Sequence, residues 1–92
     1  MQILVIKAEE HYVRITTSRG EELVLYRFSN ALADVAEEDG SRVHRSYWVR
    51  RCAVVSRRTH GKNMELLMSN GVVVPVSRCY HELVNKMVRV QG

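Results

Sequence analysis

The sequence lacks long hydrophobic runs: its apolar stretches, such as residues 72–74, are only as long as a β-strand. A membrane-spanning helix needs about 18 or more consecutive apolar residues, so we expect no membrane span. The start of the chain also lacks the charged segment and apolar core of a secretory signal. These absences predict a cytoplasmic domain, whether the full-length protein is free or membrane-anchored.

Cysteine is scarce, and Cys52 and Cys79 are separated by 26 residues. This spacing is neither a disulfide framework nor a zinc motif. The four histidines include no pair with the His-x3-His spacing of one helix face, and no Cys-x2-Cys occurs. We therefore expect reduced, partly buried thiols, no disulfide, no metal site and no cofactor.

Motifs for catalysis are also missing. The chain has no Gly-rich phosphate loop and no Gly-x-Ser-x-Gly nucleophile elbow. Nucleophilic catalysis requires a nucleophile, a base and an orienting acid that meet in space. Ser46 follows His44 by only two residues, and neighbours that close usually point in different directions. We expect no catalytic residues, and the protein is not expected to be an enzyme.

The charge is distributed unevenly over a composition that is 46% hydrophobic and 26% charged, as in ordinary globular proteins. Residues 1–40 carry four basic and eight acidic side chains, whereas residues 41–92 carry ten basic and two acidic ones. Most of the basic side chains are arginines, whose planar fork suits phosphates and base edges. A basic half of this kind is typical of a nucleic-acid-binding face. The alternative is a solvated surface with scattered arginines.

The 92 residues are enough for one domain, which we expect to be cut from a longer protein. In the first half, alternating apolar residues predict strands, and turn residues separate them. These strands cover residues 2–8, 12–17 and 22–26. A short helix is predicted to follow, with Ser29 as its N-cap and Asp39-Gly40 as its end.

In the second half, residues 42–51 fit a strand, a loop and a second short strand. Further strands are predicted at residues 52–58, 64–68 and 72–76. Pro75 cannot donate a ladder hydrogen bond, so the last strand is at a sheet edge or ends there. Ser77 is predicted to cap a terminal helix, since apolar residues follow at helical spacing: Tyr80, Leu83, Val84, Met87 and Val88. The fold class is therefore mainly β, with short antiparallel sheets and two flanking α-helices.

Several side chains that suit nucleic acid lie at the predicted turns and strand ends. Residues 44–48 place hydrogen-bond donors beside aromatic rings, and Ser77-Arg78 stands where the terminal helix begins. A helix N-terminus offers free backbone N–H groups and a positive dipole end to a phosphate. Trp48 is the only tryptophan, and we expect it in the core.

Three segments resemble the LytTR family of bacterial DNA-binding domains. Residues 8–13 (AEEHYV) resemble its A-x-(D/E)-(H/N)-Y-(V/T) start, and residues 42–49 (RVHRSYWV) its central V-H-R-S-Y-x-V signature. Residues 70–80 (NGVVVPVSRCY) resemble its closing N-G-x-x-x-P-V-S-R-x-Y block. The match covers nearly the whole chain, in order. Arg50 stands where the family commonly has asparagine, which adds charge near the signature.

The resemblance implies a β-rich fold and an output domain of a bacterial transcription regulator. It implies sequence-specific binding of double-stranded DNA by loops in successive major grooves, at paired direct repeats, with dimerisation on DNA. It also implies sensor, receiver or membrane segments in the full-length protein. By motif, the base-contacting positions are His11, Arg45 and Arg78, and the family varies at the position of Arg45.

These residues have suitable chemistry. Arg45 and Arg78 can each donate two hydrogen bonds to guanine O6 and N7, which is worth about 1–3 kcal/mol of discrimination per pair. Glu9 and Glu10 beside His11 are expected to point away from DNA or to disfavour wrong registers. Contacts to phosphates, which fix register without reading sequence, are expected from Arg14, Ser46, Arg51, Arg57, Arg58, Lys62 and Ser77.

Two other functions remain open at this point. One is a small β-rich RNA-binding or translation-control module, which would need exposed aromatic residues on a sheet. The chain has few aromatic residues to spare for this. The other is an enzyme or ligand sensor. Its only support is that some polar residues have no assigned role.

Overall fold

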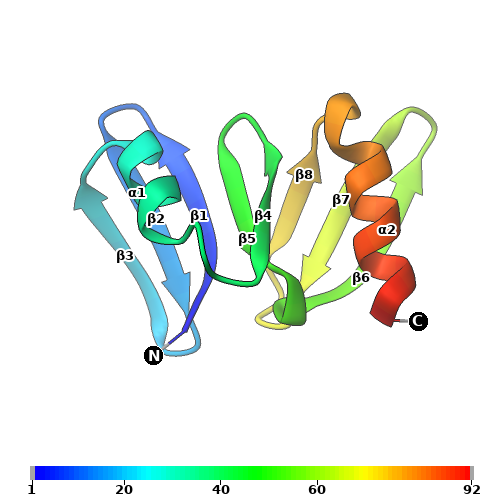
Figure 1. The fold of residues 1–92 in the computed structure, drawn as a ribbon, viewed down its shortest axis with the longest axis horizontal. Coiled ribbons are helices and arrows are strands. Elements are labelled where there is room, and N and C mark those ends of the chain that lie inside the picture. The colour runs from blue at the N-terminus through cyan, green and yellow to red at the C-terminus, as the bar shows by residue number, and fades with distance from the viewer. Residues whose placement is uncertain (1, 92) are drawn as a thin grey trace.

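The computed structural model describes the backbone of residues 2–91 and the side chains of residues 2–88. Within this range, β-strands dominate, and α-helices and short 3-10 turns (η) connect or follow them (Figure 1). The elements are β1 (Ile3–Glu9), β2 (Tyr12–Thr17), β3 (Gly20–Leu25), α1 (Phe28–Asp34), β4 (Gly40–His44), β5 (Tyr47–Arg50), η1 (Arg51–Ala53), β6 (Val54–His60), β7 (Asn63–Met68), β8 (Val73–Val76), η2 (Arg78–Tyr80) and α2 (His81–Gln91).

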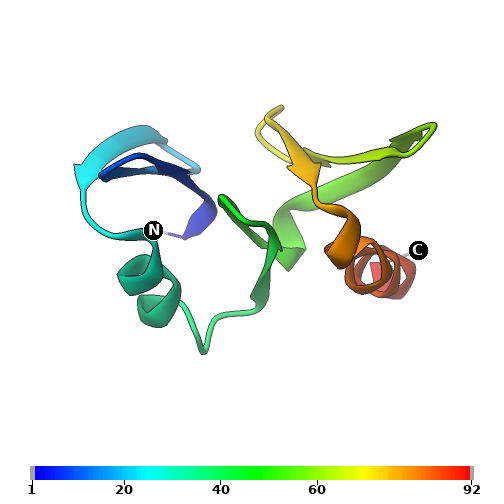
Figure 2. The same cartoon turned by 90° about the horizontal axis from the view of Figure 1, so that it is seen from above.

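The strands form two antiparallel sheets. The first sheet has the order β3-β2-β1-β5-β4, and the second has the order β6-β7-β8. Helix α1 covers one face of the first sheet, and α2 lies along the second sheet, in contact with β4 and β6 (Figures 1 and 2). This arrangement confirms the predicted class, a mainly β domain of short antiparallel sheets with two flanking helices.

A small core lies between the first sheet and α1. Ile6 and Val13 from the sheet pack with Ala31, Val35 and Trp48. The Trp48 side chain is buried as predicted, with 4% of its surface exposed. Side chains alternate along β2, so Val13 and Ile15 share this face, whereas β1 is irregular between Ile3 and Val5 and contributes Ile3 and Ile6.

A larger core joins the two sheets and α2. Val43 and Val49 from the first sheet meet Leu66 from β7 and Val84 and Met87 from α2. Val43 belongs to an irregularity in the pairing of β4 with β5, where Arg42 lies opposite Trp48 and His44 lies opposite Tyr47. Val43 is therefore the extra residue of a β-bulge.

The predicted limits of the first helix were wrong at both ends. Arg27, not Ser29, is the N-cap, and it makes no side-chain capping bond. The earlier start lets Phe28 pack against the core cluster under the sheet. The helix ends at Asp34, and Gly40 instead begins β4. Position 40 requires glycine because a Cβ there would overlap the Trp48 ring. This glycine serves close packing rather than helix termination.

Several other boundaries and exposures also differ from prediction. The 3-10 turn η1 occupies the start of the strand predicted at residue 52, and η2 separates Ser77 from α2, with no capping bond from the Ser77 side chain. Leu83 is 41% exposed although its spacing predicted burial. Cys52 and Cys79 are free but exposed, not partly buried, because each lies in a surface 3-10 turn.

The other predicted strands are present, most of them with limits that differ by one or two residues. The strand at residues 12–17 has the predicted limits, and residues 42–51 contain two short strands separated by a turn. Pro75 is exposed in β8, an edge strand of the second sheet, as its missing N–H group predicted. No helix in the described part of the chain is long and apolar enough to cross a membrane.

Candidate nucleic-acid interface

Four connections that are distant in sequence lie along one edge of the molecule, the upper edge in Figure 1. We call it the turn edge. It runs along the longest axis of the molecule, which measures 34 Å. Its members are the β1–β2 turn (10–11), the β4–β5 turn (45–46), the β6–β7 turn (61–62) and the β8–η2 connection (77–78).

His11 lies in the first of these turns. Glu9 pairs with Tyr12, so the turn contains only Glu10 and His11, and Glu10 has a left-handed backbone with φ of 56°. The His11 carbonyl accepts a hydrogen bond from the Tyr26 N–H at 3.3 Å, which ties the turn to the end of β3. The imidazole is exposed beside a groove of about 530 Å³ whose wall includes Arg27. The backbone is therefore anchored, while the His11 side chain is accessible.

Arg45 lies at the tip of the β4–β5 turn and is exposed. The next residue, Ser46, accepts a hydrogen bond through its carbonyl from the Ala8 N–H at 2.7 Å. On the preceding side, burial lowers the pKa of His44, and the positive charges of Arg45 and Arg42 lower it further. His44 is thus favoured as a neutral imidazole in a strongly cationic region.

Arg78 begins η2 at the other part of the turn edge. The preceding Ser77 N–H donates to the Val43 carbonyl at 3.0 Å, which joins the second sheet to β4. A groove of about 500 Å³ lies here, and Arg78, Lys62 and His44 are among the residues that line it. Residues that were separate predictions from the sequence therefore share one concave surface.

His81 also lines this groove, although no role was predicted for it from the sequence. It follows Arg78 by three residues, which in a helical segment places two side chains on neighbouring positions of one face. That spacing is the signal that could have identified it. Arg27 lines the groove beside His11, and it too was not predicted as a site residue. The two residues come together because the Tyr26 N–H, just after β3, donates to the His11 carbonyl in the β1–β2 turn.

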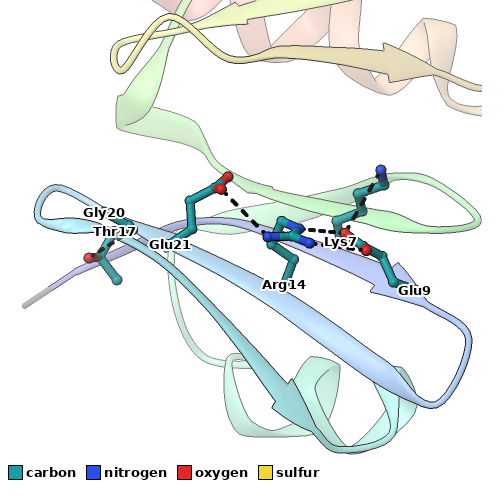
Figure 3. A network of polar contacts seen from close by, with 6 residues as sticks. All are labelled: Lys7, Glu9, Arg14, Thr17, Gly20 and Glu21. Carbon is teal, nitrogen blue, oxygen red and sulfur yellow. Dashed lines mark hydrogen bonds and ion pairs between the residues drawn. The ribbon is translucent and has the colours of Figure 1, made fainter.

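Arg14 does not belong to the turn edge. Its guanidinium hydrogen-bonds Glu9 at 2.6 Å and lies 3.5 Å from Glu21. Figure 3 shows this network, with Lys7, on the face of the sheet opposite α1. The Arg14 hydrogen bond lowers the pKa of Glu9, and the same bond raises the pKa of Arg14. One of the two acids near His11 is therefore turned toward cations of the protein.

Arg51 is also displaced from the turn edge. It lies in η1, at the opposite end of β5 from the β4–β5 turn, and it pairs with Asp39 at 2.9 Å. Arg57 and Arg58 occupy β6, which leads toward the β6–β7 turn. Both are exposed, but Arg57 hydrogen-bonds Asn85 and Arg58 pairs with Glu65 at 2.8 Å. Lys62 lies at the tip of that turn.

Arg50 is buried, which its position in the sequence did not predict. Its side chain is only 7% exposed and forms an ion pair with Glu38. It donates to the Ile3 carbonyl at 2.7 Å, and its guanidinium lies 5.7 Å from the centre of the Trp48 ring. Arg50 follows Trp48 by two residues in β5, so the two share a face of the sheet. Its charge is therefore inside the fold rather than near the turn edge.

The fold and the turn edge together define a class of protein. Exposed cations gathered on one side of a small domain are the electrostatic footprint of a nucleic-acid-binding protein. In the described residues, no group of three or more His, Cys, Asp or Glu could hold a metal ion. Arg45, Arg78 and Lys62 have no carboxylate partner within residues 2–88, unlike Arg14 and Arg50.

Comparison with known proteins identifies the family. The profile of the LytTr DNA-binding domain matches residues 1–89, so this chain belongs to the LytTr DNA-binding domain family. The family is one of DNA-binding domains rather than of enzymes. No curated protein matches the chain significantly.

A solved structure supports the fold. It is the LytTr DNA-binding domain of a Bacillus cereus protein assigned as a methyl-accepting/DNA response regulator. The two share 20% sequence identity with a TM-score of 0.78, and the match covers 94% of this chain and 80% of the other. The family resemblance and the fold class predicted from the sequence are both confirmed.

Proposed function

We propose that this domain binds double-stranded DNA sequence-specifically, as the output domain of a bacterial transcription regulator. The turn edge lies along the duplex. The observation that supports this is the gathering of His11, Arg45 and Arg78 on one edge from turns that are far apart in sequence. The edge follows an axis of 34 Å, about the length of one DNA helical turn. It is therefore long enough to reach two successive major grooves from one side of the duplex.

His11, Arg45 and Arg78 read base edges in this proposal. Arg45 and Arg78 are exposed and, within the described residues, unpaired with carboxylates, so their guanidinium forks can contact guanine O6 and N7. An arginine already paired with an acid would have to give up that partner first. His11 donates to an acceptor such as guanine N7.

Phosphates are contacted by the residues that flank these three. Lys62 and His81 line one groove with Arg78, and their positive or polar groups suit a phosphodiester. We retain Ser46, Ser77, Arg57 and Arg58 as further phosphate contacts; Arg58 exchanges its ion pair with Glu65 for a phosphate, which its 58% exposed side chain allows. Arg14 and Arg51 are removed from this set, because one is held by Glu9 and the other lies away from the turn edge.

Single-stranded RNA is the weaker alternative. Proteins that read it expose aromatic rings on which bases stack. Here Trp48 is buried, and the hydroxyl of the exposed Tyr26 donates to Asp34 at 2.6 Å. Of the Phe, Tyr and Trp residues in the described part of the chain, only Tyr12 and Tyr26 are exposed, which is few for a stacking platform.

Selection from a random pool of duplex DNA at near-physiological salt tests the proposal. We expect an enriched motif with two half-sites about one helical turn apart, consistent with paired direct repeats and dimerisation on DNA. Arg45→Ala should lose the preference at the one base pair that Arg45 reads. Arg51→Ala, the same change away from the turn edge, should keep the preference at every base pair. Equal retention of all duplexes, or stronger competition by single-stranded RNA, would contradict the proposal.

A further inference from the structure

We infer that Arg42 is a positioning residue, which holds the β4–β5 turn so that Arg45 reads its base from a fixed place. Arg42 itself need not touch the DNA. The inference rests on the proposed function, because it concerns how base preference arises at the middle of the turn edge. It is carried by the hydrogen bonds that end on the backbone of this turn.

Arg42 reaches the turn from one side. Its Nη2 donates to the Arg45 carbonyl at 2.6 Å, and its Nε donates to the His44 carbonyl at 3.3 Å. The guanidinium lies 5.3 Å from the centre of the Phe28 ring, so the first residue of α1 supports it from behind. One planar side chain thus joins two consecutive carbonyls of the turn to the helix.

His44 reaches the turn with its side chain rather than its backbone. Its Nδ1 accepts a hydrogen bond from the Ser46 N–H at 3.1 Å. The imidazole also packs edge-on against Tyr47, with 5.5 Å between ring centres. The Ser46 carbonyl is held separately by the Ala8 N–H. The backbone of residues 44–46 is therefore bonded from Arg42, from His44 and from β1.

The bulge at Val43 explains how Arg42 and His44 can act from two sides. In a regular strand, residues two apart lie on the same face. Here Arg42 lies opposite Trp48, whose ring packs toward α1, whereas His44 lies opposite the next residue, Tyr47. The extra residue between them enters the main core. Arg42 and His44 therefore occupy different faces of the sheet and hold the turn between them.

This support has a functional consequence, because a base contact depends on the position of the residue that makes it. A bidentate contact to guanine requires both the location and the direction of the Arg45 side chain to be correct. Lysine at position 42 would supply one compact charge but could not hold two carbonyls with a planar fork. The geometry, not only the charge, of Arg42 is then needed for base preference at Arg45.

Binding measurements on a four-variant set test this inference. Arg45→Ala first identifies the base pair that Arg45 reads. We expect Arg42→Ala to lower the preference at that base pair by roughly five- to tenfold, while the base pair read by Arg78 keeps its preference. Because Arg42 acts through Arg45, the double variant Arg42→Ala/Arg45→Ala should lose no more preference there than Arg45→Ala alone.

Arg42→Lys separates geometry from charge. It should keep the general affinity for DNA at the wild-type level but leave the preference at the Arg45 base pair low. Should Arg42→Ala fail to fold, this variant carries the same test. Additive losses in the double variant, equal losses at every base pair, or full base preference in Arg42→Lys would each overturn the inference. A fall of about one unit in the salt slope for Arg42→Ala would also overturn it, as the mark of a direct phosphate contact.

A measurement without DNA distinguishes failure of this inference from failure of the proposed function. In the free domain, the amide order parameters of Arg45 and Ser46 should be near 0.85 and should fall below about 0.6 in Arg42→Ala. Unchanged order parameters would show that the turn is rigid without Arg42, which overturns the inference. Wild-type protein with a rigid turn but no base preference would instead contradict the proposed function.

Discussion

Replacement of Arg50 by alanine is expected to destabilise the fold far more than the same replacement at Arg51. The two arginines are adjacent in sequence, and each pairs with an acid that precedes β4. Their surroundings differ, since the Arg50 side chain is 7% exposed and the Arg51 side chain is 38% exposed. This pair therefore offers a matched comparison of an interior and a surface ion pair.

The magnitude follows from what each substitution removes. Loss of Arg50 leaves the Ile3 carbonyl without its charged donor, which costs about 1–3 kcal/mol. It also removes the alkyl stem and the contact of the guanidinium with Trp48. Glu38 is 46% exposed and can return to water, so no buried charge is left behind. We expect a total of about 3 kcal/mol, against less than about 1 kcal/mol for Arg51→Ala.

Thermal and urea unfolding, followed by circular dichroism, provide the assay. For a domain of this size, about 3 kcal/mol corresponds to a fall in Tm of roughly 12–24 °C. Glu38→Gln serves as a control and should cost much less than Arg50→Ala, because the amide can still accept the Arg50 hydrogen bond. If Arg50→Ala and Arg51→Ala had equal effects, the structural role assigned to Arg50 would be refuted.

Three further expectations concern DNA binding and pH. Arg78→Ala should lose preference for the best site yet keep much of the non-specific affinity; equal losses on cognate and random duplexes in a gel-shift titration would rule out base reading. Lys62→Ala should weaken all duplexes alike and reduce the salt slope by about one unit; an unchanged slope would exclude a phosphate contact. The lowered pKa of His44 means that the unfolded chain takes up its proton first, so stability should fall as pH drops below the usual value of 6.5. His44→Asn, whose side-chain oxygen can still accept a hydrogen bond, should reduce this pH dependence in unfolding titrations; an unaltered dependence would assign it to another group.

Patterns within a strand or a turn were sufficient to predict much of the fold. The alternation in residues 12–17 matches β2, and the missing N–H of Pro75 identified an edge strand. The motif residues His11, Arg45 and Arg78 were found by resemblance, and their turns do share one edge. For β2 and Pro75, local signals sufficed because these features depend on residues that are close in sequence.

Features that depend on tertiary contacts were missed. Arg14 was predicted to contact a phosphate, but its guanidinium forms an ion pair with Glu9 across the β1–β2 hairpin. Arg50 was predicted only to add charge near the central signature, but its side chain is buried and its partner Ile3 is 47 positions away. The N-cap of α1 is Arg27 rather than Ser29, and Phe28, the first helical residue, packs partly buried against the core cluster. In each case a contact outside the local window decided the outcome.

The hydrogen bonds of the β4–β5 turn separate the chemistry of position 45 from its mechanical support. They end on the His44 and Arg45 carbonyls and on the Ser46 N–H and carbonyl, all of which are main-chain atoms. None of them requires an arginine side chain at position 45. If Arg45 reads a base as proposed, a single substitution there alters the preferred base while the surrounding framework is unchanged. On that proposal, operator preference at this position can evolve, or be engineered, without a compensating mutation in the fold.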